Sequence, residues 1–255
     1  MTPAVVAGLC SVTFRTLGVD DVIELSRRAG LGAIEWGADV HLPSGELTRA
    51  EAIRDRCVAA GLACPSYGSY WFAGKSAVDE VDRLLDTAEV IGATTIRVWA
   101  PGDPRHEAFE RSPAVVDALR KACDLAAARD TTVALEFHPN TLTETAESTC
   151  RLLAAVDRAN LRTYWQPRPG LVGRAAIDEL VRVLDSLAHL HVFSWDDESR
   201  RLPLAAHEMS WREALALAES LHRERPVCAY LEFVANDDPD VLLRDAETLR
   251  SWIAS

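Results

Sequence analysis

Four side chains that can bind a cation or move a proton stand in successive apolar runs of the second half of the chain. They are Glu136, Gln166, His191 and Glu232. A carboxylate at the end of a buried strand is costly unless it is paired or binds a cation. Three oxygens and one imidazole nitrogen, with open positions for water or substrate, suit Mn²⁺, Mg²⁺ or Co²⁺ better than a closed structural zinc site.

Each of these residues, taken alone, also has a purely structural explanation. The two glutamates could form salt bridges with a barrel arginine such as Arg97, and His191 could be a core histidine. The position of all four at neighbouring strand ends favours a shared metal site over four separate structural roles.

The four runs belong to a repeat that covers the whole chain. Eight apolar runs rich in β-branched and aromatic residues begin roughly 27 to 40 residues apart, with helical periodicity between them. They are Val6–Cys10, Ala33–Trp36, Ala63–Tyr67, Thr95–Trp99, Thr132–Glu136, Leu161–Trp165, Ala188–Ser194 and Cys228–Glu232. Eight such βα units close into a barrel. We therefore predict an α/β protein, a single (β/α)8 TIM-barrel domain over residues 1–255.

The longest connections follow the second, third, fourth and seventh strands. They cover residues 37–47, 68–77, 100–111 and 195–209. Connections that follow a strand lie at the C-terminal rim of a barrel, where the active sites of barrel enzymes are found. We expect the four candidate ligands to converge at this rim, since consecutive strands are neighbours.

Other residues near this rim are candidate substrate contacts. They are His41, Tyr67, Trp71, Arg97, Trp99, His138, Arg201 and His207. Aromatic side chains at the rim suit stacking on a sugar ring, although they could instead fix a loop to the barrel. Arg97 could bind a substrate anion or pair with Glu136. The loop residues His41, Arg201 and His207 could equally be solvated side chains.

The composition narrows the class of partner. The chain has 255 residues, 39 of them acidic and 27 basic, and the resulting net charge of -12 disfavours binding to nucleic acid. No apolar run approaches the ~18 residues of a membrane helix, and the first residues lack a secretory signal, so we expect a cytoplasmic protein without a membrane partner. The six cysteines form no C-x-x-C pair and are expected to be reduced.

With these residues in place, the whole chain resembles the xylose-isomerase-like TIM barrels, the superfamily of sugar phosphate isomerases and epimerases. In that superfamily a Glu after strand five, an Asp after strand six, a His on strand seven and a Glu after strand eight hold the metal. Glu136, His191 and Glu232 match this set, whereas Gln166 stands where Asp is usual. An amide oxygen is a weaker ligand than a carboxylate, so weaker binding is expected. The resemblance implies one divalent ion, with Mn²⁺ favoured over Mg²⁺, Co²⁺ or Zn²⁺.

The resemblance also implies a reaction. Glu136 and Glu232 would be an acid/base pair that isomerises or epimerises a small sugar or polyol through an enediolate. A lyase, dehydratase or deglycosidase on the same scaffold is the alternative. A non-catalytic sugar-binding barrel is less favoured, as is an endonuclease-like barrel acting on abasic DNA, because histidines at strand ends are few and the charge is negative. Relatives in this superfamily are often dimers or tetramers, so the resemblance is compatible with a homo-oligomer, and the sequence does not fix the oligomeric state.

Overall fold

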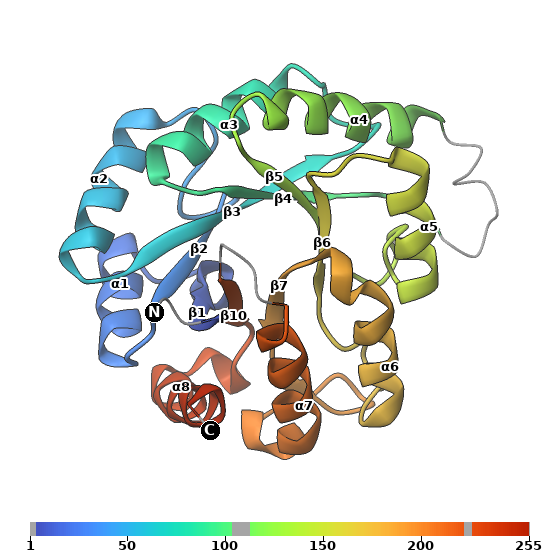
Figure 1. The fold of residues 1–255 in the computed structure, drawn as a ribbon. Coiled ribbons are helices and arrows are strands. Elements are labelled where there is room, and N and C mark those ends of the chain that lie inside the picture. Colours follow the sequence, from blue (N-terminus) through green and yellow to red (C-terminus); the bar gives the residue numbers. More distant parts are fainter. Residues whose placement is uncertain (1–3, 104–112, 222–225, 255) are drawn as a thin grey trace.

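Eight parallel strands form a closed barrel in the computed structural model, which describes residues 4–103, 113–221 and 226–254 (Figure 1). The barrel strands are β1 (Val5–Cys10), β2 (Ala33–Gly37), β3 (Ala63–Phe72), β4 (Thr95–Trp99), β5 (Thr132–Leu135), β6 (Leu161–Trp165), β7 (Leu187–Val192) and β10 (Val227–Leu231). Each strand pairs with its neighbours along the chain, and β10 closes the barrel against β1. The predicted (β/α)8 barrel is confirmed.

Helices surround the barrel on its outer side (Figure 1). They are α1 (Val19–Arg28), α2 (Leu47–Ala59), α3 (Glu80–Ile91), α4 (Pro113–Ala127), α5 (Ala146–Val156), α6 (Arg174–Val183), α7 (Glu208–Glu219) and α8 (Pro239–Ile253). Short 3-10 helices cover Ser11–Phe14, Leu184–Ser186, Leu204–His207 and Ala235–Asp237, and an antiparallel pair, β8 (Ser194–Trp195) and β9 (Arg201–Leu202), follows β7. The helices bury apolar stripes against the strands, as α3 does with Val81, Leu84 and Ala88.

Successive side chains of each strand point alternately outward and inward, and this alternation gives the barrel two hydrophobic cores. The larger core lies between the barrel and its helices, and a smaller one, which includes Cys10, Ala134, Tyr164 and Tyr230, fills the barrel interior. A Cβ on Gly8 would lie 2.7 Å from Cδ1 of Tyr230, so glycine at this position leaves room for the tyrosine ring. Ala134, Tyr164 and Tyr230 belong to this interior core. Glu136, Gln166 and Glu232, two positions later along the same strands, lie at the rim.

The rim differs from the sequence prediction after the third strand. Residues 68–72, expected in a loop, continue β3 to Phe72, with a shift in the pairing register against β4. The predicted loop at residues 195–209 contains β8, β9 and the last 3-10 helical turn before α7. Residues 104–111 of the predicted loop after β4 lie outside the described residues.

All six cysteines are free thiols, and only Cys150 is not fully buried. In the described ranges, no helix has the length and apolar character needed to cross a membrane.

Candidate metal centre and cavity

The four predicted ligands converge on one nitrogen at the barrel mouth. His191 Nδ1 lies 3.1 Å from Gln166 Oε1, 3.3 Å from Glu136 Oε1 and 3.5 Å from Glu232 Oε2. The strand ladders continue through both glutamates, whose backbone N–H groups donate to Val98 and Val192, so each carboxylate is fixed just beyond its strand. The convergence expected from neighbouring strands is therefore present.

The charges of the site are buried. As whole residues, Glu35, Glu136, Glu232 and Arg97 are each at most 6% exposed. Arg97 Nε lies 3.0 Å from Glu35 Oε1, and its Nη1 donates to Glu136 Oε2. When His191 is neutral, as an imidazole that binds a metal must be, the three ionised carboxylates among the described residues of this cluster exceed the one guanidinium by two negative charges, and buried charge of this kind requires compensation.

The two predicted acid/base residues have different surroundings. Burial alone would raise the pKa of Glu136, but Arg97 and His191 hold it below its ordinary value. Burial raises the pKa of Glu232 to about 7, and His191 opposes this shift. Burial would lower the pKa of His191, yet Glu232 and Glu136 raise it well above its ordinary value. The cluster thus attracts positive charge to the Nδ1 side of the imidazole.

Glu35, in the middle of β2, is a central member that the sequence analysis missed. Its carboxylate accepts hydrogen bonds from Arg97 Nε, from Ser66 Oγ at 2.9 Å and from the hydroxyl of Tyr164, and it lies 3.4 Å from His191 Nε2. The sequence feature that could have indicated Glu35 is a charged residue inside an otherwise apolar run. If the strand is buried, such a residue must be paired.

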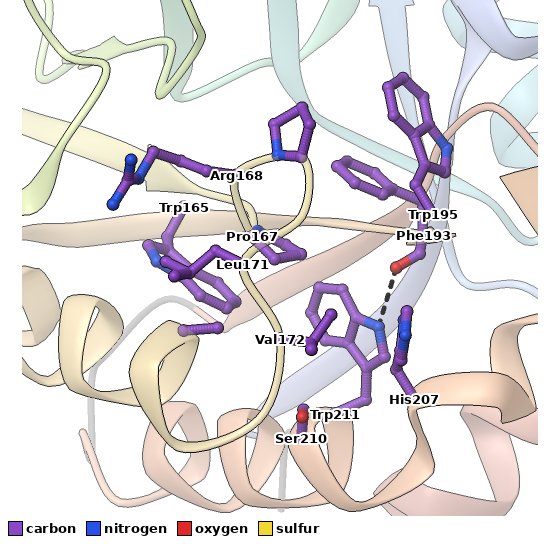
Figure 2. Close-up of a pocket in the computed structure, with 12 residues that line it drawn as sticks. Trp165, Pro167, Arg168, Leu171, Val172, Phe193, Trp195, His207, Ser210 and Trp211 are labelled. Carbon is purple, nitrogen blue, oxygen red and sulfur yellow. Dashed lines mark hydrogen bonds between the residues drawn. The ribbon is translucent and has the colours of Figure 1, made fainter. Parts of the chain in front are cut away.

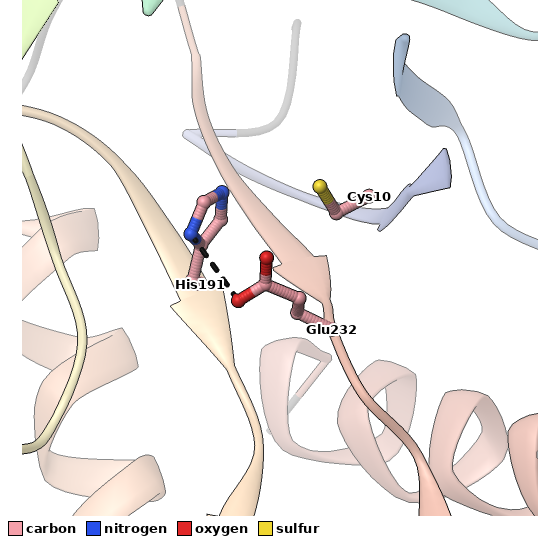
Figure 3. A group of neighbouring side chains, drawn as sticks. All are labelled: Cys10, His191 and Glu232. Carbon is pink, nitrogen blue, oxygen red and sulfur yellow. Dashed lines mark ion pairs between the residues drawn. The ribbon is translucent and has the colours of Figure 1, made fainter. Parts of the chain in front are cut away.

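Cys10, at the end of β1, also lies against this cluster. Its thiol, the imidazole of His191 and the carboxylate of Glu232 offer ligand atoms within 4.8 Å of one another (Figure 3). Cys10 Sγ donates to Glu35 Oε1 at 3.3 Å, and burial raises the pKa of this thiol. Metals bind the thiolate form of cysteine. Because burial disfavours that form, Cys10 is a neighbour of the candidate ligands and not one of them.

A cavity of about 270 Å³ opens above the cluster. Its polar lining comes from Arg97, Glu136, His138, Gln166 and Glu232, and its apolar lining from Val12, Tyr70, Trp99, Pro139, Pro169, Phe193, Trp195 and Phe233. Small-molecule sites usually measure roughly 300–1,000 Å³, so this volume suits a substrate of about monosaccharide size. Tyr70 and Trp99 stack with ring centroids 5.8 Å apart and form an aromatic wall.

A second, smaller cleft adjoins the cavity and shares Pro169, Phe193 and Trp195 with it (Figure 2). This cleft encloses only about 20 Å³, near the minimum that holds one water molecule. It contains His207 and the indole of Trp211, whose Nε1 donates to the carbonyl of Phe193 at 2.9 Å. His207 therefore lines this small cleft and is absent from the lining of the cavity above the candidate ligands.

The two aromatic residues proposed from the third strand point away from the cavity. The Tyr67 hydroxyl donates to the Leu42 carbonyl at 2.7 Å, and Trp71 Nε1 donates to the Ala77 carbonyl at 2.8 Å. Because β3 continues to Phe72, side-chain alternation also continues, and Tyr70 takes the position at the cavity. Tyr67 and Trp71 therefore do not line the described cavity, and we leave them out of the proposed site.

His41 is buried and not a solvated loop residue. Its Nδ1 lies 3.0 Å from Ser11 Oγ and its Nε2 lies 3.2 Å from the Leu17 carbonyl oxygen. Both ring nitrogens thus have protein partners, and His41 is absent from the described lining of the cavity. Its position gives it a structural role at the base of the loop after β2.

The remaining predicted contacts divide between the cavity and its surroundings. Arg97, Trp99 and His138 line the cavity, and the rings of Trp99 and His138 meet edge to face. Arg201 lies outside the described lining, where it pairs with Asp237 and sits over the ring of Phe233. The sequence left two roles open for Arg97, binding a substrate anion or pairing with Glu136. Its guanidinium pairs with Glu35 and Glu136, so the second role is the one observed.

The donor set fits a divalent cation. Ligands at right angles around an ion with ~2.1 Å bonds lie roughly 3 Å apart, close to the 3.1–3.5 Å that separates His191 Nδ1 from its three oxygen neighbours. A single N–H at Nδ1 could serve only one of these oxygens well. One divalent ion would also balance the two excess negative charges of the buried cluster.

Comparison with known proteins supports the same architecture. A sequence model described as xylose isomerase-like TIM barrel matches residues 23–240. The 3-dehydroshikimate dehydratase of Bacillus anthracis is 29% identical over 169 residues, which are 60% of this chain and 59% of that protein. The aligned part thus covers less than two thirds of the relative's length.

Solved structures with this fold include enzymes and a magnesium complex. The probable 3-DHS dehydratase AsbF of Bacillus anthracis has a TM-score of 0.80 and 20% identity over 96% of this chain and 98% of its own. A Mycobacterium smegmatis protein in complex with magnesium has a TM-score of 0.73 and 17% identity over 99% and 97%. A 3-keto-D-glucoside 4-epimerase from E. coli has a TM-score of 0.73 and 15% identity over 96% and 98%. At these identities the likeness shows the fold.

Proposed function

This chain belongs to the xylose isomerase-like TIM barrel family, and we propose that it is a divalent-metal-dependent enzyme that removes a proton next to a carbonyl of a small polyhydroxylated substrate. The observation that carries this proposal is the convergence of Glu136, Gln166 and Glu232 on His191 Nδ1 beneath a cavity. Relatives on this scaffold are described as a dehydratase and an epimerase, whose chemistry begins beside a carbonyl.

Glu136, Gln166, His191 and Glu232 would hold the ion, with substrate or water oxygens completing its coordination. When bound, a divalent cation polarises a carbonyl and stabilises negative charge that develops on its oxygen. The mixed oxygen and nitrogen donor set favours Mn²⁺, with Mg²⁺, Co²⁺ and Zn²⁺ as alternatives. A solved structure with the same fold is a complex with magnesium, which supports a divalent ion as the cofactor.

Glu232 is the better candidate for the proton acceptor. Arg97 pairs with Glu136, whereas Glu232 forms no ion pair with an arginine in the described part of the chain. A carboxylate held by a guanidinium stays ionised, and one without such a partner exchanges a proton more readily near neutral pH. In an isomerase or epimerase, the sugar-directed activity that the sequence predicts, Glu136 or Glu232 would return the proton to carbon.

Dehydration is the second candidate, and the unequal pair of glutamates favours it. Glu232 would accept the proton, the C–H electron pair would form a C=C bond, and a hydroxyl on the next carbon would leave as water after protonation. His138 lines the same cavity and is a candidate donor of that proton. The similarity to 3-dehydroshikimate dehydratase points in the same direction.

Proton NMR in D₂O tests the proposal and separates the two candidates. Purified protein with Mg²⁺ is incubated with ketoses, keto-polyols and 3-dehydroshikimate. Isomerisation or epimerisation incorporates deuterium at the carbon beside the carbonyl and produces a second sugar. Dehydration instead produces a vinyl proton signal from the new C=C bond, or aromatic proton signals where the substrate is 3-dehydroshikimate, whose ring already holds a C=C bond. Reaction by wild type but not by Glu232→Gln supports the proposal, and equal turnover by both proteins would contradict it.

A further inference from the structure

We propose that Glu35 is a positioning residue that keeps a proton on Nε2 of His191, so that the Nδ1 lone pair is presented to the metal. This inference rests on the proposed function, because it concerns how the same centre binds its ion. Glu35 does not itself face the group of oxygen ligands. It lies on the other edge of the imidazole, 3.4 Å from Nε2.

The first step is that Glu35 is an ionised carboxylate inside the barrel. The residue is fully buried, and such a group persists only when hydrogen-bond donors surround it. Arg97 Nε donates to one carboxylate oxygen at 3.0 Å, and the Tyr164 hydroxyl donates to the other. Ser66 Oγ donates to the second carboxylate oxygen at 2.9 Å. The two oxygens are therefore acceptors only.

The second step concerns the two nitrogens of His191. An acceptor-only carboxylate beside Nε2 requires a hydrogen on that nitrogen. A neutral imidazole has one N–H, so its lone pair is then on Nδ1, the atom surrounded by Glu136, Gln166 and Glu232 oxygens. A carboxylate behind a metal-binding histidine fixes the ring orientation and raises the basicity of the ligand nitrogen.

The third step is that the barrel is built to admit this carboxylate. A Cβ on Gly68 would lie 2.6 Å from Arg97 Nη2 and 3.0 Å from Glu35 Oε1, so only glycine leaves space for the pair. Arg97 then connects Glu35 to Glu136 through two nitrogens of one guanidinium. Glu35 thus supports the ligand set twice, through His191 and through Arg97.

Two measurements on wild type, Glu35→Gln and Ser66→Ala test the inference. The first is the affinity of metal-stripped protein for Mn²⁺ by calorimetry, at a temperature where circular dichroism shows every variant folded. Replacement by glutamine leaves one acceptor oxygen and introduces an amide donor facing other donors. We expect a ten- to hundredfold loss of affinity in Glu35→Gln, and less than threefold in Ser66→Ala, which loses a hydrogen bond to Glu35 away from His191.

The second measurement is the ¹⁵N spectrum of labelled histidine, assigned with a His191→Gln variant, in metal-free and Mg²⁺-loaded protein. In Mg²⁺-loaded wild type, and in metal-free wild type at a pH where the imidazole is neutral, we expect the single ring proton of His191 on Nε2, and we expect Glu35→Gln to lose this preference. An unprotonated Nε2 in the wild type, or unchanged Mn²⁺ affinity in Glu35→Gln, would overturn the inference. If the wild type binds no Mn²⁺, the proposed function fails, and the metal-free spectrum still decides the role of Glu35.

Discussion

The guanidinium of Arg97 joins Glu35 to Glu136 inside the barrel mouth, with Nε 3.0 Å from Glu35 Oε1 and Nη1 on Glu136 Oε2. Replacing Arg97 by methionine would leave two buried carboxylates without their cation. We expect Arg97→Met to lower the free energy of unfolding by about 3–5 kcal/mol, and Mn²⁺ to restore part of this loss. Urea denaturation with and without Mn²⁺ measures both effects.

The matched control for this prediction is Arg158→Met, which breaks the exposed ion pair with Asp124. Exposed pairs contribute little because water screens them, so this variant should unfold close to wild type. Equal destabilisation by the two substitutions would show that the buried pair has no special importance.

Gln166 would supply the neutral oxygen of the proposed ligand set, and its Oε1 lies 3.1 Å from His191 Nδ1. Gln166→Glu keeps the length of the side chain and adds a negative charge next to Glu136 and Glu232. We expect this variant to bind Mn²⁺ about tenfold more tightly, a difference of about 1.4 kcal/mol, and to be less stable than wild type when metal-free. Calorimetry and urea denaturation give the two quantities, and weaker binding would argue against coordination by residue 166.

Trp99 forms part of the aromatic wall of the cavity and is packed between Tyr70 and His138. With a substrate identified in the D₂O experiment, we expect Trp99→Leu to raise KM about tenfold, because stacking contributes about 0.5–1.5 kcal/mol beyond the area buried. Mn²⁺ affinity should not change. Trp252→Leu, a substitution in α8, serves as the control whose KM stays at the wild-type value.

His41 links stability to pH. Burial lowers its pKa below the ordinary value of about 6.5. The unfolded chain therefore binds a proton more readily than the folded one, and His41 makes the free energy of unfolding fall as pH drops below about 6.5. His41→Gln should remove this contribution, which is at most about 1.4 kcal/mol per pH unit. Urea denaturation at pH 7.5 and 5.5 compares the slopes, and identical slopes would contradict the assignment.

The strands and the convergence of the four candidate ligands could be predicted from the sequence because both follow from local pattern. Apolar runs at regular intervals specify the barrel, and consecutive strands bring their ends together. The prediction for β4, Thr95–Trp99, matches the observed strand, and the predicted ligand His191 lies at the centre of the observed cluster.

The sequence prediction was wrong about the extent of β3 and omitted Glu35, because both depend on contacts between strands and not on the local sequence pattern. The continuation of β3 depends on a register shift against β4, and no pattern in the sequence indicates that shift. As a result Tyr70 lines the cavity, where Tyr67 and Trp71 were predicted. Glu35 was missed because it lies in the middle of its strand, and its role depends on side chains from five other strands, among them Ser66 and Tyr164.

The central claim is a divalent-metal site made by four strand ends, and a calorimetric titration of metal-stripped protein with Mn²⁺ tests it most directly. Wild type and Glu232→Ala are compared, with circular dichroism confirming that both are folded. The account predicts one ion per chain for wild type and a loss of at least a hundredfold in affinity for Glu232→Ala. Binding of equal affinity in both proteins, or no binding by wild type, would contradict it.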